Sequence, residues 1–289
     1  MLKGSIVALI TPFKDDSLDE ENYIKLIDYH LKNGTNGIVP GGTTGESPTL
    51  SHNEHKKIIE ISVKECNSKI PVIAGTGSNS TDEAIELSKF AEKAGSNALL
   101  IVTPYYNKPT QQGLYQHYKK INDNVGIPIL IYNIPSRSVI DMTVETMTKL
   151  YELKNIIGVK DATGDLKRVG LQKKSMGNDF IQLTGNDDNA LEFNKLGGVG
   201  AIGVTANIAA KLSSDFQNAC VNDKNKASEL NKILQPLHAA MFIESNPSPV
   251  KYAASLLKMC NANVRLPLVE VQDETKKKIF EALKVAKLL

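Results

Sequence analysis

The chain has 289 residues, of which 41% are hydrophobic and 23% are charged, as in globular proteins that bury a large core. Its 34 basic and 32 acidic side chains give a formal net charge of +2, which argues against a nucleic-acid-binding protein, because such proteins carry a marked basic excess. Three scattered cysteines fit no disulfide framework, so we expect a protein of the reducing cytoplasm. The absence of an 18-residue apolar stretch argues against a membrane-spanning helix.

Short apolar runs, each long enough for one buried strand, recur along the first 204 residues. Between most of these runs the apolar residues follow a helical period, and in the first such segment they begin with Tyr23, Leu26 and Ile27. Gly34 and Gly95 follow two of the helical patterns, as glycines do at helix C-termini. The apolar runs occupy residues 5–10, 37–40, 71–75, 98–102, 127–132, 156–159, 180–184 and 200–204.

Strands that alternate with helices form parallel sheets with right-handed crossovers. Eight such units predict a (β/α)8 TIM barrel of the α/β class, and the alternative is an open, doubly wound sheet. After residue 204 the apolar pattern is helical throughout. We therefore expect a barrel in residues 1–224 and a C-terminal helical extension in residues 225–289.

The strand predicted at residues 156–159 runs directly into Lys160. Because side chains alternate along a strand, Lys160 shares a face with Ile156 and Gly158, and Val159 faces the other way. If helices cover the second face, Lys160 points into the barrel, where burial opposes the charge of its amine. A neutral lysine amine is a nucleophile suited to Schiff-base chemistry. The alternative is a lysine whose amine reaches water at the end of the strand.

A glycine-rich segment follows the second predicted strand, at the barrel end where the catalytic residues of this fold gather. Residues 41–46 read GGTTGE. Glycines beside hydroxyl groups let backbone N–H groups converge on an anion. The segment lacks the lysine of a phosphate loop, so a carboxylate is the better ligand. The alternative is an ordinary glycine turn before a helix.

Aromatic and basic side chains follow two further strands. Tyr105 and Tyr106 lie between prolines after the fourth strand, which predicts contact with a partner surface or a ligand. Tyr132 ends the strand before the one that carries Lys160, so its phenol is a candidate proton shuttle. Arg137 is a candidate clamp for a carboxylate. Considered singly, a core tyrosine and a surface arginine remain alternatives.

Other polar pairs carry weaker signals. His52 and His55 lie one helical turn apart without a third ligand, which indicates a solvated helix face. Asp187 and Asp188 are interpreted as the cap of a helix that begins near Ala190. No segment has the spacing of a metal or dinucleotide motif, so we expect neither a metal nor a cofactor.

Three motifs resemble the signatures of the pyruvate-dependent class I aldolases related to N-acetylneuraminate lyase. They are GGTTGE at residues 41–46, YNIPSR at 132–137 and GVKD at 158–161. The likeness extends from Gly4 to the segment at residues 246–251. It implies a TIM-barrel lyase that forms a Schiff base with pyruvate.

By this resemblance, Lys160 forms the imine with pyruvate. Tyr132 relays protons, assisted by the hydroxyl group of Thr43 and by Tyr106 from a neighbouring subunit. Thr44, together with Thr43, holds the pyruvate carboxylate through backbone N–H groups.

The resemblance also implies a site for the second substrate, L-aspartate 4-semialdehyde, whose carboxylate Arg137 receives. Gly185 and Ile202 match backbone positions that line the pocket. Thr43 and Arg137 favour the branch that performs this condensation in diaminopimelate and lysine biosynthesis. The alternatives are an N-acetylneuraminate lyase or a 2-keto-3-deoxy sugar acid aldolase and, outside the enzymes, a keto-acid-sensing barrel. A metal-assisted hydrolase is disfavoured because clustered ligands are lacking.

Two features concern assembly and regulation. A role for Tyr106 across an interface implies a homo-oligomer, at least a dimer, and the family is commonly a tetramer of two tight dimers. The family often has an allosteric site for L-lysine as a feedback inhibitor. This changes the interpretation of the two histidines, which become hydrogen-bonding groups beside an acidic partner for the ammonium group of the effector. The matching residues are His52, His55, Asn79, Glu83 and Tyr105.

Overall fold

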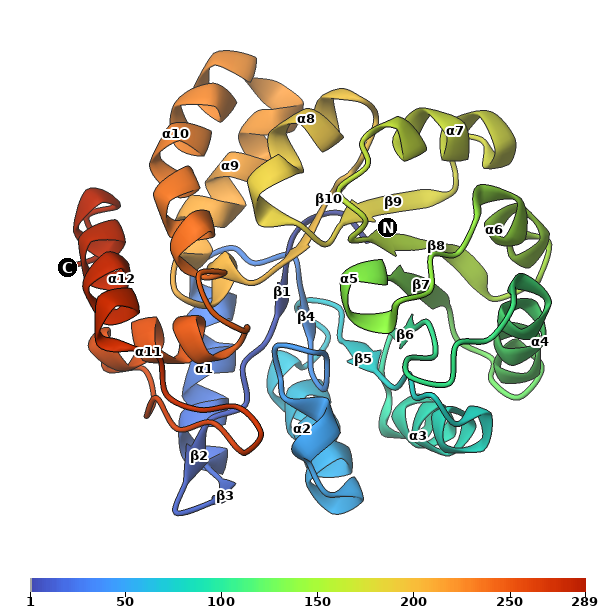
Figure 1. Ribbon diagram of the computed structural model, residues 1–289, viewed down its shortest axis with the longest axis horizontal. Helices are drawn as coiled ribbons and strands as arrows, with labels where there is room; N and C mark the ends of the chain where they lie inside the picture. Colours follow the sequence, from blue (N-terminus) through green and yellow to red (C-terminus); the bar gives the residue numbers. More distant parts are fainter. Residues whose placement is uncertain (1) are drawn as a thin grey trace.

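The structure is a computed structural model that describes residues 2–289. Eight parallel strands form one sheet in the order β4-β1-β10-β9-β8-β7-β6-β5, and a bridge between Ile38 and Val72 joins its two ends. The sheet therefore closes, which confirms the predicted (β/α)8 barrel over the open sheet (Figure 1). The strands are β1 (Gly4–Ala8), β4 (Gly37–Val39), β5 (Ile73–Gly75), β6 (Ala98–Val102), β7 (Ile129–Asn133), β8 (Ile156–Asp161), β9 (Ile181–Thr184) and β10 (Gly200–Gly203).

Helices surround the barrel, and a small hairpin of β2 (Phe13–Lys14) and β3 (Ser17–Leu18) follows β1. Three short 3-10 turns, at Ser47–Thr49, Asp187–Asn189 and Thr205–Asn207, follow β4, β9 and β10. The helices are α1 (Glu20–Lys32), α2 (His52–Cys66), α3 (Thr81–Ala94), α4 (Gln111–Asn122), α5 (Pro135–Ser138), α6 (Val144–Tyr151), α7 (Lys167–Met176), α8 (Ala190–Lys195), α9 (Ala210–Asn222), α10 (Lys224–Ala240), α11 (Ser248–Leu256) and α12 (Asp273–Val285).

Local sequence signals explain where several helices begin and end. Ser51 and Glu54 form a capping box at the start of α2, with the Ser51 side chain accepting from the Glu54 N–H. Gly95 ends α3 in the left-handed conformation, with φ of 97°, as predicted for a C-terminal glycine. Gly34 lies just beyond the end of α1 with φ of 77°, which the same rule explains.

The core has an inner and an outer layer. The inner layer fills the barrel with side chains such as Ile6, Leu100 and Leu130, and the outer layers lie between the strands and the helices. Gly158 faces the inside, where a Cβ atom would lie 2.2 Å from the carbonyl oxygen of Ile181. This close approach of two backbones requires glycine at that position.

Strict alternation along β8 predicts that Ile156 shares a face with Lys160, and this prediction is wrong. The pairing of β7 with β8 skips Ile157, because Ile129 pairs with Ile156 and the next residue of β7 pairs with Gly158. Ile156 therefore packs in the outer layer, and Ile157 packs against the inner one. Beyond this irregularity the alternation holds.

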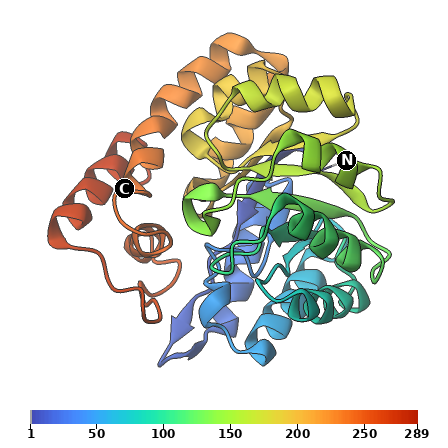
Figure 2. The ribbon, with the colours of Figure 1, turned by 45° about the vertical axis from the view of Figure 1, so that its right-hand side comes forward.

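The last three helices lie beside the barrel and share its outer core (Figure 2). Leu234 on α10, Val250 on α11 and Ile279 on α12 belong to the same hydrophobic cluster as Ile27 and Ile38 of the barrel. Helix α10 begins at Lys224, next to the expected boundary. We propose that residues 225–289 are an extension of the barrel, because they complete its core.

Candidate active site

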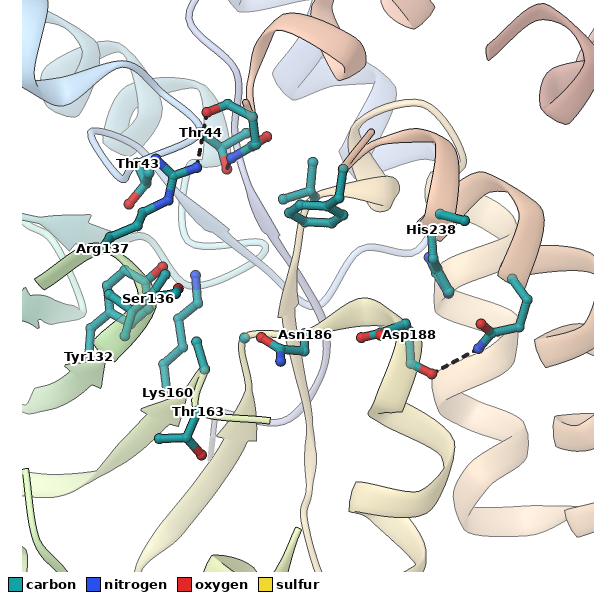
Figure 3. A pocket seen from close by; sticks show the side chains of 18 residues that line it. Thr43, Thr44, Tyr132, Ser136, Arg137, Lys160, Thr163, Asn186, Asp188 and His238 are labelled. Atoms are coloured by element: carbon teal, nitrogen blue, oxygen red, sulfur yellow. Dashed lines mark hydrogen bonds between the residues drawn. The ribbon is translucent and has the colours of Figure 1, made fainter. Parts of the chain in front are cut away.

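Lys160 and Tyr132 lie side by side near the C-terminal ends of β8 and β7, where their Cα atoms are register partners. The Lys160 amine nitrogen (Nζ) is 4.2 Å from the centre of the Tyr132 ring. Both residues are buried, with 5% and 6% of their surface exposed. Figure 3 shows both side chains at the wall of one cavity. The structure thus brings a lysine amine and a tyrosine ring together at the end of the barrel that carries catalytic groups in this fold.

The amine of Lys160 has no counter-ion among the residues that the structure describes. Within residues 2–289, no carboxylate pairs with it and no group forms a hydrogen bond to it. The neighbouring carboxylate of Asp161 is taken by Arg168, whose Nε lies 3.0 Å away, and by Gln172. Because successive side chains of a strand point to opposite faces, Asp161 lies on the side away from the cavity.

Gly185, which follows β9, leaves the space that Lys160 occupies. A Cβ atom at this position would lie 3.0 Å from the Cε atom of Lys160 and 2.7 Å from the Cβ atom of Ala162. Any larger residue would therefore push the lysine side chain aside. Gly185 lines the cavity, as the family resemblance implies.

The segment after β4 forms a tight turn over this cavity. The Gly45 N–H donates to the carbonyl of Gly42 at 3.0 Å, and the Glu46 N–H donates to that of Thr43 at 3.1 Å. In the described part of the chain, the backbone N–H groups of Thr43 and Thr44 donate to no protein acceptor. Both threonines line the cavity, so these two donors are free for an anion.

Asn246, in the extension, links two sides of the cavity. Its side-chain amide donates to the Thr44 hydroxyl at 3.0 Å, and its carbonyl accepts from the Arg137 guanidinium at 3.3 Å. Arg137 itself is exposed at the rim. The cavity has a volume of about 520 Å³, which leaves space for a second molecule beside one the size of pyruvate. Asn186, Asp188 and His238 lie across the cavity from Thr43 and Arg137 (Figure 3).

Ile202, expected to line the cavity, does not do so, and Tyr106, expected to act in a neighbouring subunit, lies away from the cavity of its own chain. Tyr106 does not line the cavity and is 90% exposed, with a left-handed φ of 72°. Ile202 is fully buried inside the barrel, and Val204, just beyond the same strand, lines the cavity instead.

The interpretation of Asp187 and Asp188 as a helix cap is wrong. The side chain of Asp187 accepts from the backbone N–H groups of Val204 and Thr205, at 2.7 and 2.9 Å, and so ties the end of β9 to the end of β10. Asp188 lines the cavity. The cap position of α8 is occupied by Asn189, which makes no side-chain capping bond.

Four of the five residues expected at the allosteric site meet around Glu83. The Glu83 carboxylate accepts a hydrogen bond from the Ser78 hydroxyl and contacts His52 Nε2 at 2.8 Å. The hydrogen bond from Ser78 is the largest cause of a lowered pKa at Glu83, and the contact with His52 is the next. The Asn79 amide donates to the Tyr105 carbonyl at 3.2 Å. Burial raises the pKa of Tyr105, with the charge of Glu83 acting in the same direction.

His55, the fifth, is buried and turns inward. Its Nε2 donates to the carbonyl of Gly75 at 2.7 Å, beneath the turn that carries Thr43. Burial lowers the pKa of His55, and the bond to Gly75 opposes this effect. The solvated-face interpretation therefore fits His52, which is exposed, and is wrong for His55.

Two further findings bear on the class of protein. Among residues 2–289, no group of three or more His, Cys, Asp or Glu side chains is arranged to hold a metal ion. No helix in the same range is both long and apolar enough to cross a membrane.

Comparison with known proteins gives concordant matches. The model of the Dihydrodipicolinate synthetase family matches residues 1–286. A curated relative from Pelagibacter ubique (strain HTCC1062), named 4-hydroxy-tetrahydrodipicolinate synthase, is 69% identical over 293 residues and is covered, like this chain, to 100%. The solved structure of dihydrodipicolinate synthase from Acinetobacter baumannii, complexed with pyruvate, is 44% identical with a TM-score of 0.98 and 100% of both chains covered. The structure of the enzyme from Cyanidioschyzon merolae with lysine bound is 34% identical, with a TM-score of 0.96 and 99% of each chain covered.

Proposed function

This chain belongs to the dihydrodipicolinate synthetase family, and we propose on that basis that it condenses pyruvate with L-aspartate 4-semialdehyde through an imine at Lys160. The product, 4-hydroxy-tetrahydrodipicolinate, places the enzyme in diaminopimelate and lysine biosynthesis, and we infer that it acts in the cytoplasm. The observation that carries the proposal is the buried Lys160 amine, without a counter-ion, beside Tyr132 in a cavity at the C-terminal end of the barrel.

The chemistry follows from the amine. Lys160 attacks the C2 carbonyl of pyruvate, and loss of water leaves a cationic iminium. The iminium draws electrons from the adjacent methyl group, which loses a proton to give an enamine. The enamine carbon attacks the aldehyde of the second substrate and forms the new carbon–carbon bond. The amino group of this adduct then attacks C2 and displaces Lys160, which closes the ring and restores the free enzyme.

We assign proton transfer to Tyr132 and Thr43. The position of Tyr132 beside the amine supports a relay that delivers a proton to the departing water and to the new alkoxide. The free N–H groups of Thr43 and Thr44 support their assignment to the pyruvate carboxylate. Arg137, at the rim, has the bidentate geometry that suits the carboxylate of the aldehyde substrate.

A substrate comparison tests this proposal. The purified enzyme is supplied with pyruvate and L-aspartate 4-semialdehyde, and the cyclic product is followed by mass spectrometry. Cleavage of N-acetylneuraminate and of 2-keto-3-deoxygluconate is measured in parallel. We expect condensation and no significant cleavage. Cleavage of either sugar acid faster than condensation would assign the chain to another branch of the pyruvate-dependent aldolases.

We also propose that Tyr106 acts in the cavity of a neighbouring subunit of a dimer or tetramer. An exposed fraction of 90% for an aromatic ring, held in a left-handed conformation, supports a partner surface at this point. Mixed dimers of Tyr106→Phe and Lys160→Ala chains give the test. Because each intact residue then sits on a different chain, one complete site forms per dimer, and activity returns only if Tyr106 serves the partner.

We further propose that L-lysine inhibits the enzyme at the cluster of His52, Glu83, Asn79 and Tyr105. The Glu83 carboxylate, with its lowered pKa, supplies the anion that the ammonium groups of lysine require. Activity is expected to fall as lysine rises through the millimolar range, and Glu83→Gln is expected to abolish this response. A flat activity curve for the unmodified enzyme would refute the proposal.

A further inference from the structure

A second buried lysine, Lys251 on α11, takes no part in the mechanism above. It is fully buried, and its amine contacts the Glu46 carboxylate at 2.6 Å, with Glu46 only 1% exposed at its side chain. The same amine donates to the Thr11 carbonyl at 2.8 Å and lies 4.2 Å from the centre of the Phe13 ring. Buried ion pairs often stabilise a fold no better than a hydrophobic pair of the same size, so stability alone is a weak explanation for this one.

Glu46 ends the turn that carries Thr43 and Thr44. It adopts a left-handed conformation with φ of 56°, which is unfavourable for a residue with a side chain. Its two carboxylate oxygens are both held from the C-terminal extension, one by Lys251 and the other by the backbone N–H of Arg265 at 3.0 Å. The strained end of the turn is therefore fixed by residues more than 200 positions away in the sequence.

The extension reaches the same turn at a second point. Asn246, just before α11, donates from its amide to the Thr44 hydroxyl at 3.0 Å. Residues 246–251 thus contact the turn on both sides of Gly45. The turn that carries the free N–H groups of Thr43 and Thr44 is therefore contacted by the extension at the residues on either side of Gly45.

We propose that the Glu46–Lys251 pair is a positioning device, by which the C-terminal extension sets the geometry of the turn that binds the pyruvate carboxylate. This inference rests on the proposed function, because it assumes that Thr43 and Thr44 bind pyruvate. Neither Glu46 nor Lys251 contacts the substrate, and the pair acts through the backbone of the turn. Its loss weakens the capture of pyruvate while the reactivity of Lys160 is retained.

Two variants separate positioning from stability. Lys251→Met breaks the pair and leaves a buried carboxylate unpaired, so both thermal stability and pyruvate binding are expected to fall. In the double variant Lys251→Met with Glu46→Gln no charge remains buried, and the unfolding temperature is expected to recover most of its loss. The KM for pyruvate is expected to stay raised by about 10- to 100-fold in the double variant, because a shift of about 1 Å in a binding group has effects of this size. The kcat at saturating pyruvate is expected to change by much less.

Glu54→Gln is the matched control. Glu54 holds the Arg265 guanidinium at 2.6 and 2.8 Å and so ties the same extension to α2, but it lies outside the turn. Its loss is expected to leave the KM for pyruvate unchanged. A double variant whose KM for pyruvate returns to the unmodified value together with its stability would overturn the inference. Failure of the unmodified enzyme to form an imine with pyruvate would instead refute the proposed function.

Discussion

Lys160 and Lys251 are buried lysines in two regions of one molecule, and they differ in the groups that surround their amines. The exposed fractions are 5% and 0%, and each amine lies 4.2 Å from the centre of an aromatic ring. Lys251 faces a carboxylate, whereas Lys160 faces an open cavity without a counter-ion. The amine of Lys251 is committed to its carboxylate partner, whereas the amine of Lys160 has a face open to a bound molecule, as a nucleophile requires. The partner of a buried lysine, more than its burial, therefore separates the two roles.

The largest expected effect is a loss of turnover at the Lys160 site when Tyr132 is replaced. Removing the phenol hydroxyl in Tyr132→Phe should lower kcat by roughly 10²- to 10⁴-fold, the usual contribution of a general acid or base. The ring remains beside Lys160, so borohydride trapping of the pyruvate imine should persist. Steady-state kinetics and the mass of the trapped protein check both statements, and a variant with unimpaired kcat would remove Tyr132 from the mechanism.

Lys251→Met tests the structural role of the second lysine through the stability of the fold. Removing one member of a buried pair leaves a charge without compensation, which typically costs about 3–5 kcal/mol in the free energy of unfolding. Lys160→Met leaves no buried carboxylate unpaired and should cost far less. Urea denaturation of both variants measures the difference. Equal losses of stability at the two positions would contradict the distinction between these lysines.

Arg137→Ala is expected to affect the binding of only one of the two substrates. The charge-assisted contact with the aldehyde carboxylate should be worth about 1.5–3 kcal/mol in binding free energy. The KM for L-aspartate 4-semialdehyde should therefore rise by roughly one to two orders of magnitude, and the KM for pyruvate should not change. If the KM for the aldehyde is unaffected, Arg137 has a different role.

The smallest expected effect is a change in how stability depends on acidic pH, and it comes from the Glu54–Arg265 pair near Lys251. Hydrogen bonds from Arg265, the largest cause, lower the pKa of Glu54 from 4.5 to about 2. Because the folded pKa lies below the unfolded value, this pair stabilises the fold fully above about pH 4.5, and the contribution is lost as the pH falls toward 2. Denaturation between pH 6 and pH 3 should show a shallower loss of stability for Glu54→Gln than for the unmodified protein. Parallel curves would show that the pair contributes nothing.

The sequence predicts the catalytic half of the comparison well, for a physical reason. Lys160 and Tyr132 each end an apolar run, and neighbouring parallel strands place their C-terminal ends at one edge of the sheet. Short-range periodicity is therefore enough to bring them together. The irregular pairing at Ile157 is not visible in that periodicity, because it depends on how β7 and β8 align.

The structural half could not be predicted in this way. Lys251 and Glu46 are separated by 205 positions, and neither belongs to a local pattern that indicates an ion pair. The helix-cap interpretation of Asp187 is wrong for the same reason, since the backbone N–H groups that donate to its carboxylate belong to Val204 and Thr205, which follow the next strand. Tyr106 carries a sequence signal, yet a single chain does not contain the surface against which it would act.

Reduction of the pyruvate-treated enzyme with borohydride, followed by peptide mapping, tests the central claim most directly. Reduction of an imine leaves a stable adduct on the amine that formed it. We predict one adduct, on the peptide that contains Lys160, and none on the peptide that contains Lys251, with no adduct in a Lys160→Ala variant. An adduct on Lys251, or full activity without an adduct on Lys160, would contradict this claim.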